Sequence, residues 1–293
     1  MRPDWKGNGP IVIGGMGGSG TRLVAEILSQ FGIFLGDDLN AASDNLLYTL
    51  LFRRSTWFYK SYQNKNRIET GLSVMEKLLL KEYGLSIQEI WFLLYAVTDT
   101  ALHYRRDERS WSMIRLRKII NNPKFKDAQY IGWGWKEPNS YLILQDLIDH
   151  FKSLKFIHTI RHGADMAFSK NQRQLKTWGM LFGIPQPEIE HPRESLKFWA
   201  RANQAVAEVG ESLGANQYLQ INYDLLCQKP QQIIDELITF LNLDVDMPTY
   251  KAVLKLPIIP PSMGRYKKED LSQLDSEDLT VVESFGFTVE YIA

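Results

Sequence analysis

The sequence predicts an α/β fold: a parallel sheet of the kind found in P-loop proteins, flanked by helices and carrying a mostly helical insertion. The first observation is the short apolar run Pro10-Ile11-Val12-Ile13-Gly14, which is typical of a strand buried on both faces. The second is that apolar residues recur at helical spacing over residues 21–31. The third is the alternation of strand and helix patterns further along, which favours parallel strands joined by right-handed crossovers.

Three further strands are predicted at residues 130–135, 155–160 and 217–222, and each precedes a helical pattern. Residues 142–148 are helix-like, and another helical stripe begins after a proline, a residue favoured at helix starts. That stripe comprises Pro230 followed by Ile233, Ile234, Leu237, Ile238 and Leu241.

The segment that follows the first helix is rich in Leu, Tyr and Trp and has few helix breakers. We therefore expect a helical insertion at about residues 46–125, within a single domain spanning residues 1–293. Prolines and glycines gather between Trp178 and Pro192, which predicts a loop.

Composition excludes several classes of protein. The chain has 34 basic and 34 acidic residues, so no overall field draws it toward nucleic acid or an anionic surface, and any anion site must be local. Its single cysteine, Cys227, excludes an internal disulfide. We find neither a signal peptide nor an apolar run long enough to span a membrane, and so expect a soluble, cytoplasmic protein. The sequence gives no indication of oligomeric state.

The glycine-rich segment Gly14–Thr21 lies where the first strand meets the first helix, so its backbone N–H groups can converge on an anion. The alternative is a flexible turn, although five glycines with Ser and Thr exceed what a turn needs. A Walker A loop would have lysine after Gly20, where this chain has Thr21. The strand at 155–160 is followed by Arg161 and not by a metal-binding carboxylate. These residues favour an anion site with no metal.

At these positions the sequence resembles the sulfotransferases that use 3′-phosphoadenosine-5′-phosphosulfate (PAPS) and require no metal. The similarity is to bacterial-type members, with some motifs like those of tyrosylprotein sulfotransferases. The segment Gly18-Ser19-Gly20-Thr21-Arg22 resembles the family's 5′-phosphosulfate loop, in which a basic residue usually occupies the position of Gly18. The resemblance implies that these residues and Gly17 bind the donor, with Arg22 the candidate for the missing charge.

The resemblance extends to the nucleotide's 3′ end. Arg161 and Ser169, eight residues apart, match the family's 3′-phosphate pair, with the serine expected two turns into the next helix. Gly264 and Arg265 lie in a segment similar to the family's late loop over the same phosphate, although a solvated basic loop would look alike. Tyr223 follows a strand, as does the family tyrosine beside the nucleotide.

Catalytic residues are implied by the same resemblance. Lys136, in Trp135-Lys136-Glu137-Pro138, matches the lysine that faces the sulfuryl group. Asp38, in Gly36-Asp37-Asp38, matches the general base of the tyrosylprotein enzymes, with Asp37 and Asp44 as rivals. The alternative for Asp37 and Asp38 is a loop or capping role.

Other side chains are less suited to catalysis. His103, His158 and His162 are expected to be structural, and Cys227 has no identifiable basic partner that would make it a nucleophile. Aromatic residues in the insertion are candidates for an acceptor cleft but are more often core. These are Trp57, Phe58, Tyr59 and Tyr62, next to Arg53 and Arg54.

We expect an enzyme that moves a sulfuryl group from PAPS to a hydroxyl or amine, leaving 3′-phosphoadenosine-5′-phosphate. Its partners would be the nucleotide and an acceptor that the sequence does not identify: peptide tyrosine, carbohydrate, lipid or small phenol. The loop at 178–192 is a candidate lid. Two alternatives stay open, an ATP-dependent kinase with a degenerate P-loop and a catalytically silent nucleotide-binding scaffold.

Overall fold

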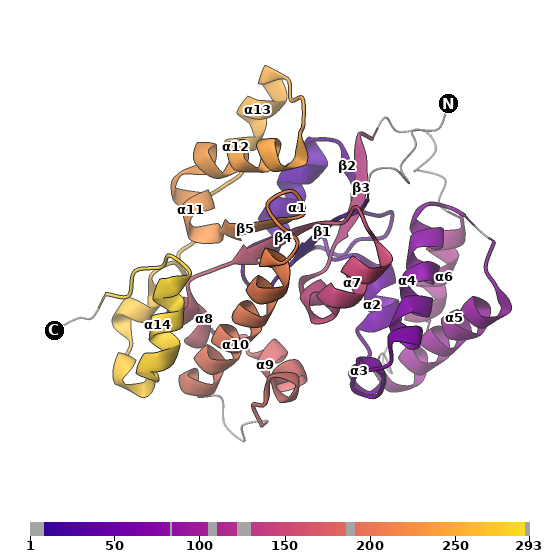
Figure 1. Ribbon diagram of the computed structural model, residues 1–293, viewed down its shortest axis with the longest axis horizontal. Coiled ribbons are helices and arrows are strands. Elements are labelled where there is room, and N and C mark those ends of the chain that lie inside the picture. The colour runs from indigo at the N-terminus through magenta and orange to yellow at the C-terminus, as the bar shows by residue number, and fades with distance from the viewer. Residues whose placement is uncertain (1–8, 83, 105–109, 122–129, 186–190, 291–293) are drawn as a thin grey trace. The chain divides into compact units, whose positions relative to one another are not determined.

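The computed structural model describes residues 9–82, 84–104, 110–121, 130–185 and 191–290, and it contains a five-stranded parallel sheet in the order β2-β3-β1-β4-β5 (Figure 1). The strands are β1 Ile11–Gly14, β2 Ile33–Phe34, β3 Gly132–Lys136, β4 Lys155–Ile160 and β5 Tyr218–Asn222. The predicted α/β class, with helices around a parallel sheet, is therefore confirmed. The two-residue strand β2 was not predicted because it is too short to show a period.

The chain divides into two compact units. Unit 1 comprises residues 1–13 and 24–155, and unit 2 comprises residues 14–23 and 156–293. Helix α1, Thr21–Gln30, begins in the segment of unit 2 and continues into unit 1. The expectation of a single domain over residues 1–293 stays a prediction.

Unit 1 contains the expected helical insertion, which surrounds α4 with α2, α3, α5 and α6. Figure 1 shows α4, α5 and α6 side by side. The helices of this unit are α2 Leu46–Phe52, α3 Ser55–Ser61, α4 Lys65–Leu79, α5 Ile87–Asp99, the π-helix η1 Thr100–Tyr104, α6 Trp111–Asn121, the 3₁₀ helix η4 Pro138–Ile143 and α7 Leu144–His150.

Unit 2 is built around β4 and β5, which pair in parallel from Phe156 with Tyr218 to Ile160 with Asn222. Long helix α10 packs on α8 and on β5. The helices are α8 Gly163–Ala167, α9 Arg173–Trp178, the 3₁₀ helix η5 Gly179–Phe182, α10 Pro192–Glu211, α11 Tyr223–Gln228, α12 Pro230–Leu241, α13 Met247–Val253, the 3₁₀ helices η6 Arg265–Lys268 and η7 Leu271–Gln273, and α14 Ser276–Ser284.

Two sequence expectations in unit 2 need correction. Helix α8 is a single turn that ends at Ala167, so Ser169 lies beyond it and not two turns inside it. The predicted loop at 178–192 includes the 3₁₀ helix η5, while its residues 186–190 lie outside the described part of the chain.

Strand β3 is buried along its whole length and organises the core of unit 1. Trp133 and Trp135 pack their rings against Phe151, at centroid distances of 6.0 and 5.8 Å. At Gly134, an added Cβ would lie 1.8 Å from the carbonyl oxygen of Ile11 on β1, so only glycine permits this approach. The register that follows pairs Ile13 with Lys136, the last residue of β3.

Glu137 fixes the turn at the end of β3. It is the N-cap of η4, and its carboxylate accepts hydrogen bonds from the Asn139 backbone N–H at 2.7 Å and from Asn139 Nδ2 at 2.9 Å. The side chain is fully buried, and Arg53 Nη1 lies 3.7 Å from Oε1. Burial raises the pKa of Glu137 to about 7, and Asp44 adds to the rise against the opposing charge of Arg53 and the Asn139 hydrogen bonds.

This raised pKa predicts that the free energy of unfolding falls between about pH 4.5 and pH 7. The folded chain retains a proton on Glu137 that the unfolded chain has lost, so stability present at low pH is lost as pH rises through the folded value. From 4.5 to about 7, the effect is roughly 3 kcal/mol. We expect urea unfolding of Glu137→Gln to lack this slope, since its neutral amide can still accept the Asn139 backbone N–H. Parallel stability profiles for the two proteins would contradict the assignment.

Candidate functional site

The glycine-rich loop in unit 2 runs from Gly14, the last residue of β1, to Thr21, the first residue of α1. Gly15 has φ 140°, and a Cβ there would lie 2.3 Å from the carbonyl oxygen of Thr159 on β4. Gly20 has φ 93°, and its Cβ would lie 1.9 Å from Cδ2 of Tyr223. Both positions therefore require glycine, because the loop passes directly against β4 and the tyrosine ring.

The loop contains one buried hydroxyl with no partner. Ser19 is 1% exposed, and its Oγ has no hydrogen bond within the described part of the chain. The hydroxyl of a buried serine is costly to leave unpaired, which makes Ser19 Oγ a candidate to contact a bound oxyanion. The Gly17 N–H, in contrast, donates to Gln174 Oε1 at 2.7 Å. Gly18 and Arg22 are both exposed.

Arg161 follows β4 and is held in place on several sides. Its Nη2 donates to Ser262 Oγ at 2.8 Å, and its guanidinium lies 5.5 Å from the centroid of the Tyr223 ring. Its carbonyl oxygen accepts the indole N–H of Trp199 at 3.0 Å. The Arg161 Nε is buried without a partner among the described residues, so the fixed guanidinium keeps a donor available for an anion.

A second arginine belongs to the same segment of unit 2. Arg265 Nε donates to the carbonyl oxygen of Ser262 at 3.2 Å, so Ser262 contacts both guanidinium groups. The turn is held by Asp165, whose carboxylate accepts the N–H of Gly264 at 2.7 Å and of Tyr266 at 3.1 Å. Ser262 thus joins Arg161 and Arg265, while the binding of a 3′-phosphate by Arg161, Gly264 and Arg265 stays a prediction.

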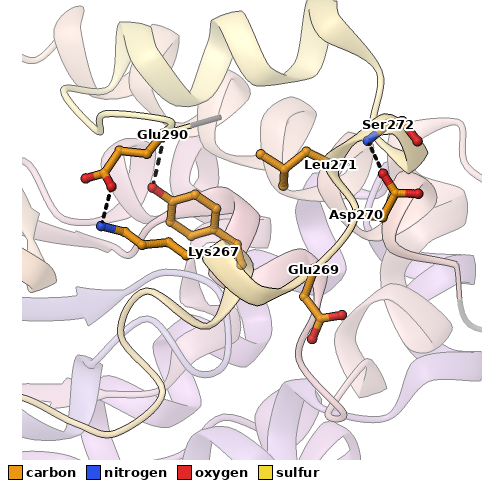
Figure 2. Close-up of a pocket in the computed structure, with 7 residues that line it drawn as sticks. Lys267, Glu269, Asp270, Leu271, Ser272 and Glu290 are labelled. Atoms are coloured by element: carbon orange, nitrogen blue, oxygen red, sulfur yellow. Dashed lines mark hydrogen bonds and ion pairs between the residues drawn. The ribbon is translucent and has the colours of Figure 1, made fainter. Parts of the chain in front are cut away.

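The other side of this turn is acidic. Figure 2 shows the carboxylate of Glu290 facing Lys267, and the two form an ion pair at 2.7 Å. The surrounding 310 Å³ pocket is also lined by Glu269 and Asp270, so it is unsuited to a phosphate. Lys267 is engaged there with Glu290.

Ser169 is not joined to Arg161 in this structure. Its Oγ accepts the N–H of Asn171 at 3.3 Å, and its carbonyl oxygen accepts Gln172 Nε2 at 2.6 Å. No hydrogen bond connects Ser169 with Arg161 among the described residues. Its place in the 3′-phosphate pair stays a prediction.

Lys136 belongs to unit 1, where its ammonium is 2% exposed. Its Nζ is paired with the Oδ1 of Asp44 and donates to the carbonyl oxygen of Ala42 at 2.9 Å. Asn40 Nδ2 donates to the other carboxylate oxygen of Asp44 at 2.9 Å, and the Asn45 N–H donates to the Lys136 carbonyl at 2.8 Å. The loop that precedes α2 therefore encloses the lysine.

Asp38 and Asp37 lie in the same unit but have different partners. Asp38 is buried, and its Oδ1 lies 3.1 Å from Arg115 Nη1 and 3.2 Å from Lys118 Nζ, both on α6. Its Oδ2 is buried without a partner among the described residues. Asp37 pairs with Lys81 at 2.6 Å. Of the three candidate bases, only Asp44 contacts Lys136 among the described residues, whereas Asp37 Oδ1 and Asp38 Oδ2 are each buried without a partner there.

The aromatic residues proposed for an acceptor cleft are largely core. Trp57 and Phe58 are buried, and Arg54 is buried with its guanidinium 4.3 Å from the Trp57 centroid and 3.0 Å from Asp99. Tyr62 is exposed. The structure therefore favours the core interpretation for Trp57, Phe58 and Arg54.

His158 and His162 make structural contacts, and Cys227 is buried. His158 lies between the Tyr218 hydroxyl at 2.8 Å and Asn203 Oδ1 at 3.0 Å, and burial lowers its pKa to about 3. The His162 ring stacks on Tyr266 at 4.4 Å. Burial raises the pKa of the Cys227 thiol. The side chain of His103 lies outside the described part of the chain.

Neither a metal site nor a membrane-spanning helix is found among the described residues. They contain no group of three or more His, Cys, Asp or Glu side chains placed to hold a metal ion. Among them no helix is both long and apolar enough to cross a membrane.

Comparisons with known proteins identify a family for this chain. A model described as the sulfotransferase family matches residues 10–247. The fold is similar to the sulfotransferase domain of the olefin synthase of Synechococcus PCC 7002, with 16% identity, 99% of each chain covered and a TM-score of 0.51. It is also similar to the sulfotransferase domain from the curacin biosynthetic pathway, with 20% identity, 97% of this chain and 99% of that chain covered, and a TM-score of 0.51.

No curated protein matches the sequence. The family model covers most of the chain, from the residue before β1 to the first residue of α13, and so includes the glycine-rich loop, Lys136 and Arg161. The chain therefore belongs to the sulfotransferase family, which supports a function in sulfuryl transfer.

Proposed function

We propose that this chain transfers a sulfuryl group from PAPS to a hydroxyl or amine of an acceptor and releases 3′-phosphoadenosine-5′-phosphate. The observation that carries the proposal is in unit 2, where two buried donors without partners in the described chain, Ser19 Oγ and Arg161 Nε, accompany the glycine-rich loop and Tyr223. Hydroxyl and guanidinium donors are the groups that bind phosphate oxygens, so these residues fit the nucleotide.

Unit 2 supplies the proposed nucleotide contacts. The 5′-phosphosulfate would be bound by Gly17, Gly18, Ser19, Gly20, Thr21 and Arg22. Arg161, Ser169, Gly264 and Arg265 would bind the 3′-phosphate, and Ser262 would orient both arginines. Tyr223 packs between Gly20 and Arg161 and would lie beside the nucleotide.

The roles of Lys136 and Asp38 in transfer are carried over from the sequence resemblance. In transfer, the bond from sulfur to the donor phosphate oxygen breaks and a bond from sulfur to the acceptor oxygen or nitrogen forms. Lys136 would stabilise the charge that develops on the oxygens, and Asp38 Oδ2 would receive the acceptor proton. Asp44, with both oxygens engaged, would position Lys136 and not act as the base.

The primary test is thermal stability with two ligands. We expect 3′-phosphoadenosine-5′-phosphate to stabilise the protein with EDTA present, by about 3 kcal/mol at a hundredfold excess over Kd. ATP with Mg²⁺ should have little effect, because the loop has Thr21 in place of the Walker lysine. Stabilisation by ATP with Mg²⁺ alone would favour the kinase. Nucleotide binding without transfer from labelled PAPS to any acceptor in a broad screen would favour the silent scaffold.

Arg161→Ala should weaken binding of a nucleotide that has a 3′-phosphate more than binding of one that has only a 5′-phosphate. We expect the variant to bind 3′-phosphoadenosine-5′-phosphate roughly 10- to 100-fold more weakly, since it loses charge-assisted hydrogen bonds worth about 1.5–3 kcal/mol. Affinity for adenosine 5′-phosphate should change by less than about threefold, because that ligand lacks the 3′-phosphate. Titration calorimetry measures both affinities.

The matched control is Arg193→Ala, which removes an exposed arginine paired with Asp275 on the surface of the same unit. It should leave both affinities unchanged. Equal losses for the two nucleotides in Arg161→Ala would contradict a 3′-phosphate contact.

Lys136 is tested together with its counter-ion, because removing the lysine alone would leave Asp44 buried and unpaired. In the double variant Lys136→Met, Asp44→Asn, we expect kcat to fall by about 100-fold or more while nucleotide affinity stays within a few-fold. The single variant Asp38→Asn should also lower kcat, and the loss should be smaller for acceptors with more acidic hydroxyls. Unchanged kcat in the double variant would remove Lys136 from the reaction.

A further inference from the structure

Helix α5 exposes an apolar face in unit 1. Its exposed large side chains recur at helical spacing, and two from α6, with which α5 packs, add to them. Ile87 is 78% exposed and Trp91 is 68% exposed. We name this surface the α5–α6 patch, which comprises Ile87, Ile90, Trp91, Leu94 and Tyr95 of α5 with Met113 and Ile114 of α6. A run of this kind is unlike the single exposed apolar residues common on protein surfaces.

The orientation of α5 is the reverse of an ordinary surface helix. It buries Glu89, with Leu93, Ala96 and Val97, and turns the larger apolar residues outward. Glu89 is fixed by a capping box with Ser86 and by Lys77, whose Nζ lies 2.8 Å from Oε1. Rotating the helix to bury Trp91 would break these contacts, so the exposed face is a built feature.

The charge of the patch is basic. Arg117 and Lys118 are exposed on α6, which has no acidic residue in its sequence, and Lys118 also pairs with the buried Asp38. The exposed side chains described on α5 and α6 include no carboxylate. In a chain of zero formal net charge, α6 therefore adds positive charge to a patch that contains Trp91 and Tyr95, and Trp and Tyr are residues favoured where membrane meets water.

We propose that the α5–α6 patch binds the surface of a bilayer containing anionic phospholipid, with α5 lying in the interface. Helix α5 has 13 residues, about 20 Å, which is too short to span a bilayer but sufficient for an interfacial helix. Trp91, Leu94 and their neighbours enter the headgroup region, while Arg117 contacts lipid phosphates. A self-complementary contact with a second copy is less favourable, because the exposed side chains of these helices offer no carboxylate to their own basic residues.

The test is sedimentation of the full chain with vesicles of phosphatidylcholine alone and of phosphatidylcholine mixed with phosphatidylserine. We expect binding to the mixed vesicles, weakened by salt, and much weaker binding to phosphatidylcholine. The double variant Trp91→Ser, Leu94→Ser should lower the partition coefficient by about tenfold or more. Its control is Met247→Ser, Ile258→Ser, which removes equally exposed apolar residues from unit 2 and should bind as the parent does.

A dye-labelled variant tests whether the α5–α6 patch enters the interface of the bilayer. Tyr95→Cys, labelled with a polarity-sensitive dye, should shift its emission to the blue on mixed vesicles, and buried Cys227 limits labelling elsewhere. Arg117→Gln should reduce binding to mixed vesicles while leaving the weak phosphatidylcholine binding unchanged.

No vesicle binding by the parent, or equal binding by the Trp91→Ser, Leu94→Ser variant, would overturn the proposal. So would a parent dimer that this variant converts to monomer without any vesicle binding. Nucleotide binding plays no part in these measurements.

Discussion

The burial of the Lys136 ammonium is the constraint around which the end of β3 is built. A charge that is 2% exposed must be paired and hydrogen-bonded, or its desolvation would cost several kcal/mol. Asp44 and the Ala42 carbonyl meet that need, and Asn40 in turn holds Asp44. The Asn45 N–H donates to the Lys136 carbonyl as well, so the chain that leads into α2 is held to Lys136 by both its backbone and its side chain. A lysine enclosed in this way has a fixed position before any ligand arrives.

In unit 2 the proposed anion site depends on how its basic side chains are oriented and not on an excess of positive charge. The two arginines of the proposed nucleotide site are oriented by one serine, and the turn that carries Arg265 is held by the carboxylate of Asp165. The carboxylate of Asp165 thus stabilises the turn that carries the basic side chain of Arg265. The proposed nucleotide site therefore needs no excess of basic residues over the whole chain, which has equal numbers of acidic and basic residues.

Much of this fold could be predicted from local sequence. Strands β1, β3, β4 and β5 were predicted because each is a short apolar or aromatic run bounded by polar or turn residues. What could not be predicted depends on distant contacts. The pairing of Lys136 with Asp44 spans 92 positions, and only the folded chain distinguishes Asp44 from Asp37 and Asp38. Likewise, the apolar character of α5 is plain in the sequence, but its outward orientation depends on Glu89 meeting Lys77.

The contact between Gly20 and Tyr223 has a consequence for how this sequence can diverge. The two positions lie 203 residues apart, yet a side chain at position 20 would overlap the tyrosine ring. A larger residue at position 20 is therefore tolerable only after position 223 has become smaller, and the positive φ at Gly20 penalises the change even then. The order of substitutions is thereby constrained: Tyr223 can vary first, whereas Gly20 cannot. Among related sequences, a residue larger than glycine at position 20 should occur only together with a residue smaller than tyrosine at position 223.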